Sequence, residues 1–151
     1  MNVAFFLIPK HEVAFLFDHC TMRQAIEKME YHHYTAIPIL NQNGEYVGTL
    51  TEGDLLRKLK NTPGLDFDRT QEVLLKEIPL LRDVKPIGVH ADIEDIFTMA
   101  VDQNFIPVID DTNKFIGIIR RRELIEYMFR RMNSGSGTAK VPADAWENKP
   151  L

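Results

Sequence analysis

The sequence has little of what marks secreted, membrane-spanning or nucleic-acid-binding proteins. Its 151 residues include one cysteine, Cys20, which excludes an internal disulfide and is typical of a reducing compartment. No apolar run approaches the roughly 18 residues that cross a bilayer, and the apolar opening segment lacks the basic residues of a signal peptide. The formal net charge of −4 disfavours general nucleic-acid binding. We therefore expect a cytoplasmic protein with neither a membrane nor a nucleic acid as its partner.

Signatures of catalysis and of metal binding are missing as well. The sequence contains no P-loop, dinucleotide fingerprint or Ser/His/Asp arrangement. His32 and His33 are adjacent in a predicted helix, so their side chains do not converge on one metal ion. Cys20 follows His19, but no third residue is placed to orient that histidine for nucleophilic catalysis. We therefore expect a protein that is not an enzyme and needs no metal.

What the chain does contain is an internal repeat. Pro38 and Gly48 are each repeated 69 residues later, as Pro107 and Gly117 (107 − 38 and 117 − 48). Around them, both halves show the same order of patterns: a short strand, an amphipathic helix, an apolar strand, a turn, a second strand and a helix. Such a repeat indicates duplicated units that pack on each other. The predicted fold is α/β (α+β), made of two pseudo-symmetric β-α-β-β-α units.

Composition sets the predicted boundaries. We expect the first unit, with the N-terminal segment, in residues 1–60 and the second unit in residues 81–132. Residues 61–80 form a linker with one short helix, because a Thr-Pro-Gly sequence interrupts the preceding helix. Residues 133–151 begin with Ser/Gly-rich linker chemistry and have no periodic apolar face. They are predicted to be a flexible tail, either disordered or left over from cloning, and the alternative is a docking peptide anchored by Trp146.

The junction from Gly48 to Asp54 is the first candidate binding site. Thr51 falls at the N-cap of a helix and Asp54 follows three residues later. Free N–H groups and the helix dipole favour an anion at such a position, and a carboxylate beside them can hold the hydroxyl groups of a sugar. The alternative is an ordinary N-cap followed by a favourable acid in the first helical turn.

The corresponding junction in the second half is rich in arginine. Arg120, Arg121 and Arg122 precede Glu123 at the start of a predicted helix, where cations oppose the helix dipole. A local rule broken without evident compensation often marks a functional site, and Glu123 offsets only part of the charge. The arginines are therefore predicted to bind phosphate, and the alternative is a solvated patch.

Together these patterns resemble a tandem pair of CBS domains, a family named after cystathionine β-synthase, over about residues 3–132. The sequences Thr35-Ala-Ile-Pro38 and Gly48-Thr-Leu-Thr-Glu-Gly-Asp54 are similar to the family's adenosine-nucleotide motif. The second copy departs from it, with Arg120 in place of the hydroxyl residue and Glu123 in place of the aspartate. The segment Tyr34-Thr-Ala-Ile-Pro-Ile39 and the arginine pair are similar to small stand-alone bacterial members, some of which bind cyclic di-AMP.

The resemblance implies two CBS units packed as one Bateman module, a regulatory homodimer formed through helices. It implies that AMP, ADP, ATP or cyclic di-AMP binds in the cleft between the units, and that an unidentified protein partner responds. Thr51 and Asp54 are then expected to bind the ribose and help to position a phosphate. Residues 120–123 are expected to bind the negative charge of the ligand. An apolar slot for the base is expected from Val13, Ala14, Tyr34, Thr35, Ala36 and Pro38, with Phe105, Ile106 and Pro107 in the second unit.

Two other classes of function stay open from the sequence. A constitutive dimeric scaffold without a small-molecule ligand would keep the motif only as structure and recruit a partner through the tail or the dimer surface. Nucleic-acid binding through the arginines is disfavoured by the net charge.

Overall fold

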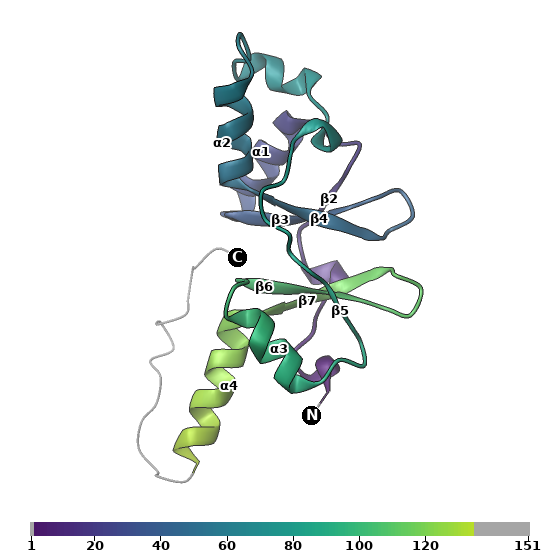
Figure 1. Ribbon diagram of the computed structural model, residues 1–151, viewed down its shortest axis with the longest axis vertical. Coiled ribbons are helices and arrows are strands. Elements are labelled where there is room, and N and C mark those ends of the chain that lie inside the picture. The colour runs from purple at the N-terminus through teal and green to yellow at the C-terminus, as the bar shows by residue number, and fades with distance from the viewer. Residues whose placement is uncertain (1, 135–151) are drawn as a thin grey trace.

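The computed structural model describes residues 2–134 and consists of two stacked units (Figure 1). Each unit has a small sheet with a pair of helices on its outer side, so that the two sheets face each other in the middle of the molecule. This arrangement confirms the predicted fold class and the internal repeat. None of the helices formed by residues 2–134 is long and apolar enough to cross a membrane.

The first unit is a three-stranded sheet under helices α1 and α2. Its elements are β2 (Leu16–Phe17), α1 (Met22–His32), β3 (Ala36–Leu40), β4 (Tyr46–Thr51) and α2 (Glu52–Asn61). The central strand β3 pairs in parallel with β2 and antiparallel with β4. Both helices begin with a capping box, in which Thr21 and Thr51 each accept a hydrogen bond from a backbone N–H three residues later. Both capped starts agree with the sequence pattern.

The second unit repeats this order in β5 (Ile87–Gly88), α3 (Ile93–Ala100), β6 (Phe105–Ile109), β7 (Phe115–Arg120) and α4 (Arg121–Asn133). The pairing of β6 with β7 reproduces that of β3 with β4, including a register shift near the end of each hairpin. The helix α4 reaches Asn133, where we expected the tail to begin. The rest of the predicted tail lies outside the described residues.

The N-terminal segment belongs with the second unit, which corrects the predicted boundary. Strand β1 (Ile8–Pro9) pairs antiparallel with β7 at the edge of the second sheet. The one-turn helix η1 (Val3–Phe5) buries Val3 in the core of the second unit. This pairing satisfies backbone groups on the free edge of β7, a long-range contact that local patterns do not reveal. Helix η2 (Lys10–Glu12) then leads back to the first unit.

The linker also differs from the prediction, and it extends from the end of α2 at Asn61 to the start of β5 at Ile87. Instead of one short helix it forms two 3-10 helices, η3 (Asp68–Glu72) and η4 (Leu75–Glu77). Leu75 and Ile78 enter the core of the first unit, with 2% and 4% of their surfaces exposed. The linker is thus packed onto α1 and the sheet, because an apolar side chain gains more from burial than from solvent contact.

The two units share a core between their sheets. The strand β3 is buried on both faces: Ile37 and Ile39 face the helices, while Ala36 and Leu40 face the other unit. The cluster between the sheets consists of Val13, Ala36, Leu40, Phe105, Phe115 and Ile118. The hairpin ends also meet, since the backbone N–H of Phe115 donates to the carbonyl of Gly44 over 2.9 Å. These contacts hold the two sheets face to face.

Tyr46 attaches the linker to this shared core. Its hydroxyl donates to the carbonyl of Val84 over 2.9 Å and lies 2.7 Å from the hydroxyl of Thr49. Its ring stacks on Phe115 of the second unit. Burial raises the pKa of Tyr46 to about 12, the hydrogen bond to Thr49 opposes the shift, and the negative charge of Asp83 adds to it. The phenol therefore stays protonated and keeps its donor well above neutral pH.

This pKa predicts a pH dependence of stability. An unfolded tyrosine ionises near pH 10, whereas Tyr46 in the folded protein does so near pH 12. The stabilisation is therefore complete below pH 10 and is lost as the pH rises towards 12, by up to about 3 kcal/mol. Urea denaturation between pH 8 and 11 should show a steeper fall for the wild type than for Tyr46→Phe. Identical slopes in the two proteins would contradict the assignment.

A matched pair of glycines tests the pairing of β1. A Cβ at Gly117 would lie 2.1 Å from the backbone oxygen of Ile8, and its φ is +154°. At the equivalent Gly48 the nearest atom, at 2.6 Å, is only the end of the Leu80 side chain. We expect Gly117→Ala to lower the free energy of unfolding by roughly 2–3 kcal/mol and Gly48→Ala by less than about 1 kcal/mol. Equal losses on chemical denaturation would argue against β1 as the cause.

Candidate functional site

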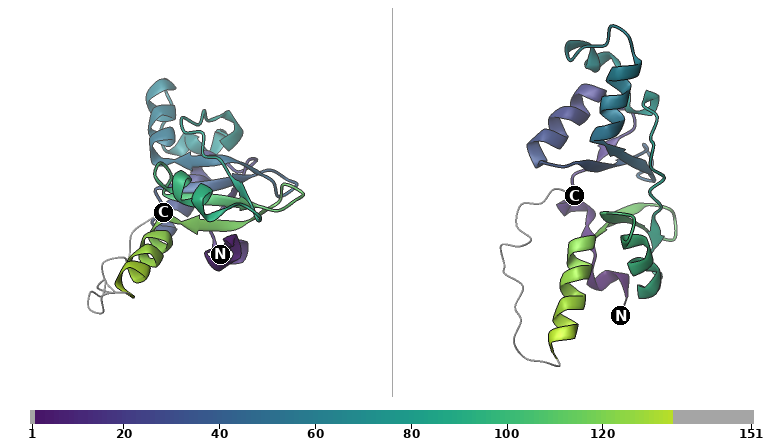
Figure 2. Two further views of the ribbon diagram at one scale, coloured as in Figure 1. Left: turned by 60° about the horizontal axis from the view of Figure 1, so that its bottom comes forward. Right: turned by 60° about the vertical axis from the view of Figure 1, so that its left-hand side comes forward.

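A cleft of about 380 Å³ lies between the two units and includes residues from both. Ala36, Thr49 and Thr51 come from β3 and β4 of the first unit. Residues 82–84 come from the linker and residues 102–105 from the entry to β6. Figure 2 (right) shows the linker, in teal, running from one unit to the other along one side of the sheets. A ligand in this cleft would touch both units and the segment that joins them.

The linker side of the cleft is held in place by Gln103. The side-chain amide of Gln103 accepts from the backbone N–H of Lys85 and donates to its carbonyl, both over 3.3 Å. It also lies 3.4 Å from the carbonyl of Phe105. Asp83 forms an exposed ion pair with Lys85, 2.7 Å long. These bonds fix the linker against the start of β6 and so define one wall of the cleft.

Thr51 is the predicted site residue that the structure places in the cleft together with a helix N-terminus. Its hydroxyl oxygen accepts from the backbone N–H of Asp54 over 3.2 Å. Because that bond uses the oxygen as an acceptor, the hydroxyl proton can still be donated to a ligand oxygen. Ala36 and Phe105 are the other predicted residues that line the cleft, and their buried apolar surfaces suit the face of a base.

Asp54 is buried beneath this wall and does not line the cleft. None of its side-chain surface is exposed. Its carboxylate accepts from the backbone N–H groups of Thr51 (2.9 Å) and Leu81 (3.0 Å) and pairs with Arg57 over 2.5 Å. In this structure the carboxylate therefore ties the linker to the start of α2. A ribose contact by Asp54 stays a prediction. It requires the carboxylate to exchange these bonds for hydrogen bonds to the ribose hydroxyl groups.

The arginines at the start of α4 have partners within the fold that the sequence argument did not identify. Arg120 pairs with Glu123 through two contacts, one of them 3.1 Å long between Nε and Oε2. Arg121 donates to the carbonyls of Ala100 (2.7 Å) and Val101 (3.4 Å) at the end of α3. Arg122 lies 3.7 Å from Glu123. Residues 120–123 are not among those that line the described cleft, and phosphate binding by them stays a prediction.

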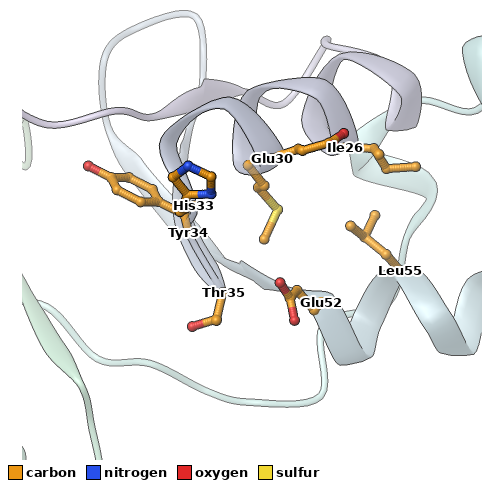
Figure 3. Close-up of a pocket in the computed structure, with 8 residues that line it drawn as sticks. Ile26, Glu30, His33, Tyr34, Thr35, Glu52 and Leu55 are labelled. Atoms are coloured by element: carbon orange, nitrogen blue, oxygen red, sulfur yellow. The ribbon is translucent and has the colours of Figure 1, made fainter. Parts of the chain in front are cut away.

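The remaining predicted residues lie in the core or line a second pocket. Val13 and Ala14 are buried in the inter-unit cluster and in the first-unit core, and Ile106 is buried in the second-unit core. Tyr34 and Thr35 line a different pocket, between α1 and α2 (Figure 3). Pro38 and Pro107 are buried in the middle of β3 and β6.

The sequence argument missed most of the polar lining of the cleft. The missed residues are the polar Thr49, Arg82, Asp83, Asp102, Gln103 and Asn104 and the apolar Val84. The internal repeat held a signal for several of them: Gln103 and Asn104 stand 69 residues after Tyr34 and Thr35, which were selected (103 − 34 and 104 − 35). The cleft brings one cation, Arg82, together with two acids, Asp83 and Asp102. Within residues 2–134 no group of three or more His, Cys, Asp or Glu side chains is arranged to hold a metal.

The contrast between Asp54 and its repeat equivalent Glu123 yields a test of these roles. Asp54→Ala would leave a half-buried arginine and two N–H groups without their acceptor, so we expect a loss of roughly 3–5 kcal/mol in the free energy of unfolding. Glu123 is 26% exposed and bonds to one neighbouring side chain at short range, so Glu123→Ala should cost about 1 kcal/mol or less. Urea denaturation measures both, and a mild effect of Asp54→Ala would contradict its tethering role.

Several known proteins share this architecture. Cyclic di-AMP receptor B of Bacillus subtilis is 22% identical over 133 residues, which cover 88% of this chain and 90% of that protein. The crystal structure of CbpB in complex with c-di-AMP superposes with a TM-score of 0.79 at 22% identity, covering 90% of this chain and 89% of the other. CbpB of Listeria monocytogenes in complex with c-di-AMP gives 0.75 at 20% identity, covering 87% and 98%.

The family assignment follows the internal repeat. The CBS domain family matches residues 7–61 and again residues 75–130. The first match contains the three-stranded sheet with α1 and α2, and the second contains β5, β6, β7, α3 and most of α4. Together they cover more than half of the chain. The chain therefore belongs to the CBS domain family and contains two CBS domains.

Proposed function

We propose that this protein is a regulatory module that senses an adenine nucleotide, with cyclic di-AMP as the leading candidate, in the cleft between its two CBS domains. It acts by binding and not by catalysis, in the cytoplasm, and as a homodimer. The choice of cyclic di-AMP is supported by the B. subtilis relative, which is named as a receptor for that nucleotide and aligns with 88% of this chain.

The observation on which the proposal depends is the composition of the cleft wall. Thr51 at the start of α2, Asn104 before β6 and Val84 of the linker all face one cavity. Apolar Ala36 and Phe105 suit a base, and Thr51 offers a hydroxyl beside a helix N-terminus, where negative charge is stabilised. A cavity of about 380 Å³ falls within the range of small-molecule sites.

A ligand in this position has a direct route to regulation. The cleft includes the linker, which Tyr46 and Gln103 hold against opposite units. A ligand that binds one arrangement of units and linker more tightly than another shifts the population towards that arrangement. Exposed apolar side chains on α1, α2 and α4 then provide surfaces for a second copy or for a regulated partner: Tyr31, Leu56, Ile125 and Met128.

Isothermal titration calorimetry with AMP, ADP, ATP and cyclic di-AMP tests the proposal. We expect saturable 1:1 or 1:2 binding of cyclic di-AMP and an increase in Tm with ligand concentration, since a ligand that binds only the folded state stabilises it. Absence of heat and of a thermal shift with all four nucleotides would overturn the proposal and favour a constitutive scaffold.

Two threonines with the same structural role provide a matched pair of variants. Thr21 and Thr51 both form capping boxes, but only Thr51 lines the cleft. Each substitution by alanine should cost about 1 kcal/mol of stability. Thr51→Ala should in addition weaken nucleotide binding roughly tenfold, because a hydrogen bond to a charged ligand is worth about 1.5 kcal/mol or more. Equal affinities for the two variants by calorimetry would place the ligand elsewhere.

A further inference from the structure

The pocket between α1 and α2 lies apart from the nucleotide cleft and has a volume of about 390 Å³. Figure 3 shows Ile26 and Leu55 at one end of it and His33 and Tyr34 at the other, with Glu52 between them. Met29 and Leu55 are buried, whereas the side chains of Glu30 and Glu52 are exposed. The pocket therefore combines apolar walls with two carboxylates.

The internal repeat shows which side chain takes the place of Glu52 in the second unit. Glu52 and Arg121 are repeat equivalents, since the backbone N–H of Glu52 donates to Thr35 over 3.1 Å and that of Arg121 to Asn104 over 2.9 Å. The two donors and the two acceptors are each 69 residues apart (121 − 52 and 104 − 35). The backbone is thus the same at both positions, and only the side chain differs.

In the second unit the arginine at this position bonds to the neighbouring helix of the same chain. The guanidinium of Arg121 donates to the carbonyls of Ala100 and Val101 at the end of α3. Ala100 is buried, as is Met29 on α1. The two residues correspond, since each stands eight residues after the N-cap of its helix, Asp92 and Thr21 (100 − 92 and 29 − 21). In the first unit the side chain at the equivalent position is a glutamate, which cannot donate to carbonyls. The pocket there stays open and carries negative charge in place of the cation.

We propose that the pocket between α1 and α2 receives an arginine side chain presented by a protein partner. The stem of an arginine can lie on Ile26, Met29 and Leu55, while its head reaches the two carboxylates, which suits the amphipathic shape of this side chain. Guanidinium–carboxylate bonds are charge-assisted and have matching planar geometry.

The occupant is distinguished from other cations by the shape of the pocket. An ammonium group is a compact, strongly hydrated charge and does not reproduce the planar fork that Arg121 uses in the second unit. The partner is therefore expected to present arginine, and lysine at the same place should be a poor substitute. Because the acids are exposed, the interaction should weaken as salt screens the charges.

Titration of the full chain with L-argininamide, followed by NMR of the methyl groups of Ile26, Met29 and Leu55, tests this proposal. We expect saturable shifts of these methyl signals at millimolar concentrations, and at least roughly threefold weaker binding of L-lysinamide. Absence of shifts, or equal binding of the two amides, would overturn the proposal. The readout is independent of nucleotide binding, so failure of the sensor function would leave it intact.

Charge-matched variants separate the pocket from the net charge of the protein. Glu52→Arg places in the first unit the side chain that the second unit already has, so the new arginine should fill the pocket and abolish the shifts. Glu94→Arg makes the same charge change in the first turn of α3 and should leave them unchanged. Glu52→Gln is a smaller change that removes only the negative charge and should keep the fold. It should weaken binding of L-argininamide roughly threefold. Equal effects of Glu52→Arg and Glu94→Arg would contradict the assignment.

Discussion

The packing of the two sheets against each other is the constraint on which the rest of the structure depends. Each sheet has helices on one side only, so its inner face would be left in water without the other unit. Ala36 and Leu40 on one side and Phe105 and Phe115 on the other close this interface, and the hairpin ends are joined by backbone hydrogen bonding. Because both faces of β3 and β6 are buried, their sequences are continuous apolar runs without alternating polar residues.

This interface also determines where a binding site can form. At the edge of the shared core the linker runs from one unit to the other and borders the cleft. Three polar side chains hold it there: Asp54 binds the N–H of Leu81, Tyr46 binds the carbonyl of Val84, and Gln103 binds the backbone of Lys85. The cleft is therefore built from both units and from their connection, which makes its shape sensitive to how the units are arranged.

The duplicated units have kept the same backbone and diverged in their side chains. At one pair of equivalent positions, Asp54 holds the linker while Glu123 pairs with the arginine beside it. At another, Glu52 borders an open pocket while Arg121 donates a hydrogen bond to a carbonyl at the end of α3. A fold duplicated in this way contains two units with similar backbones. Replacement of a single charged side chain can then turn one unit into a binding surface.

The sequence by itself determined the features that depend on short-range chemistry. The repeat, the order of the strands and helices, both threonine caps and the family resemblance follow from local spacing, because periodicity and capping act within a few residues. Tertiary structure alone decided which distant groups meet. It paired β1 with β7 instead of with the first unit, buried Asp54 against an N–H 27 residues away, and gave Arg121 the carbonyls of α3. Sequence patterns show which side chains are available, but the partners that satisfy them are set by the packing of whole units.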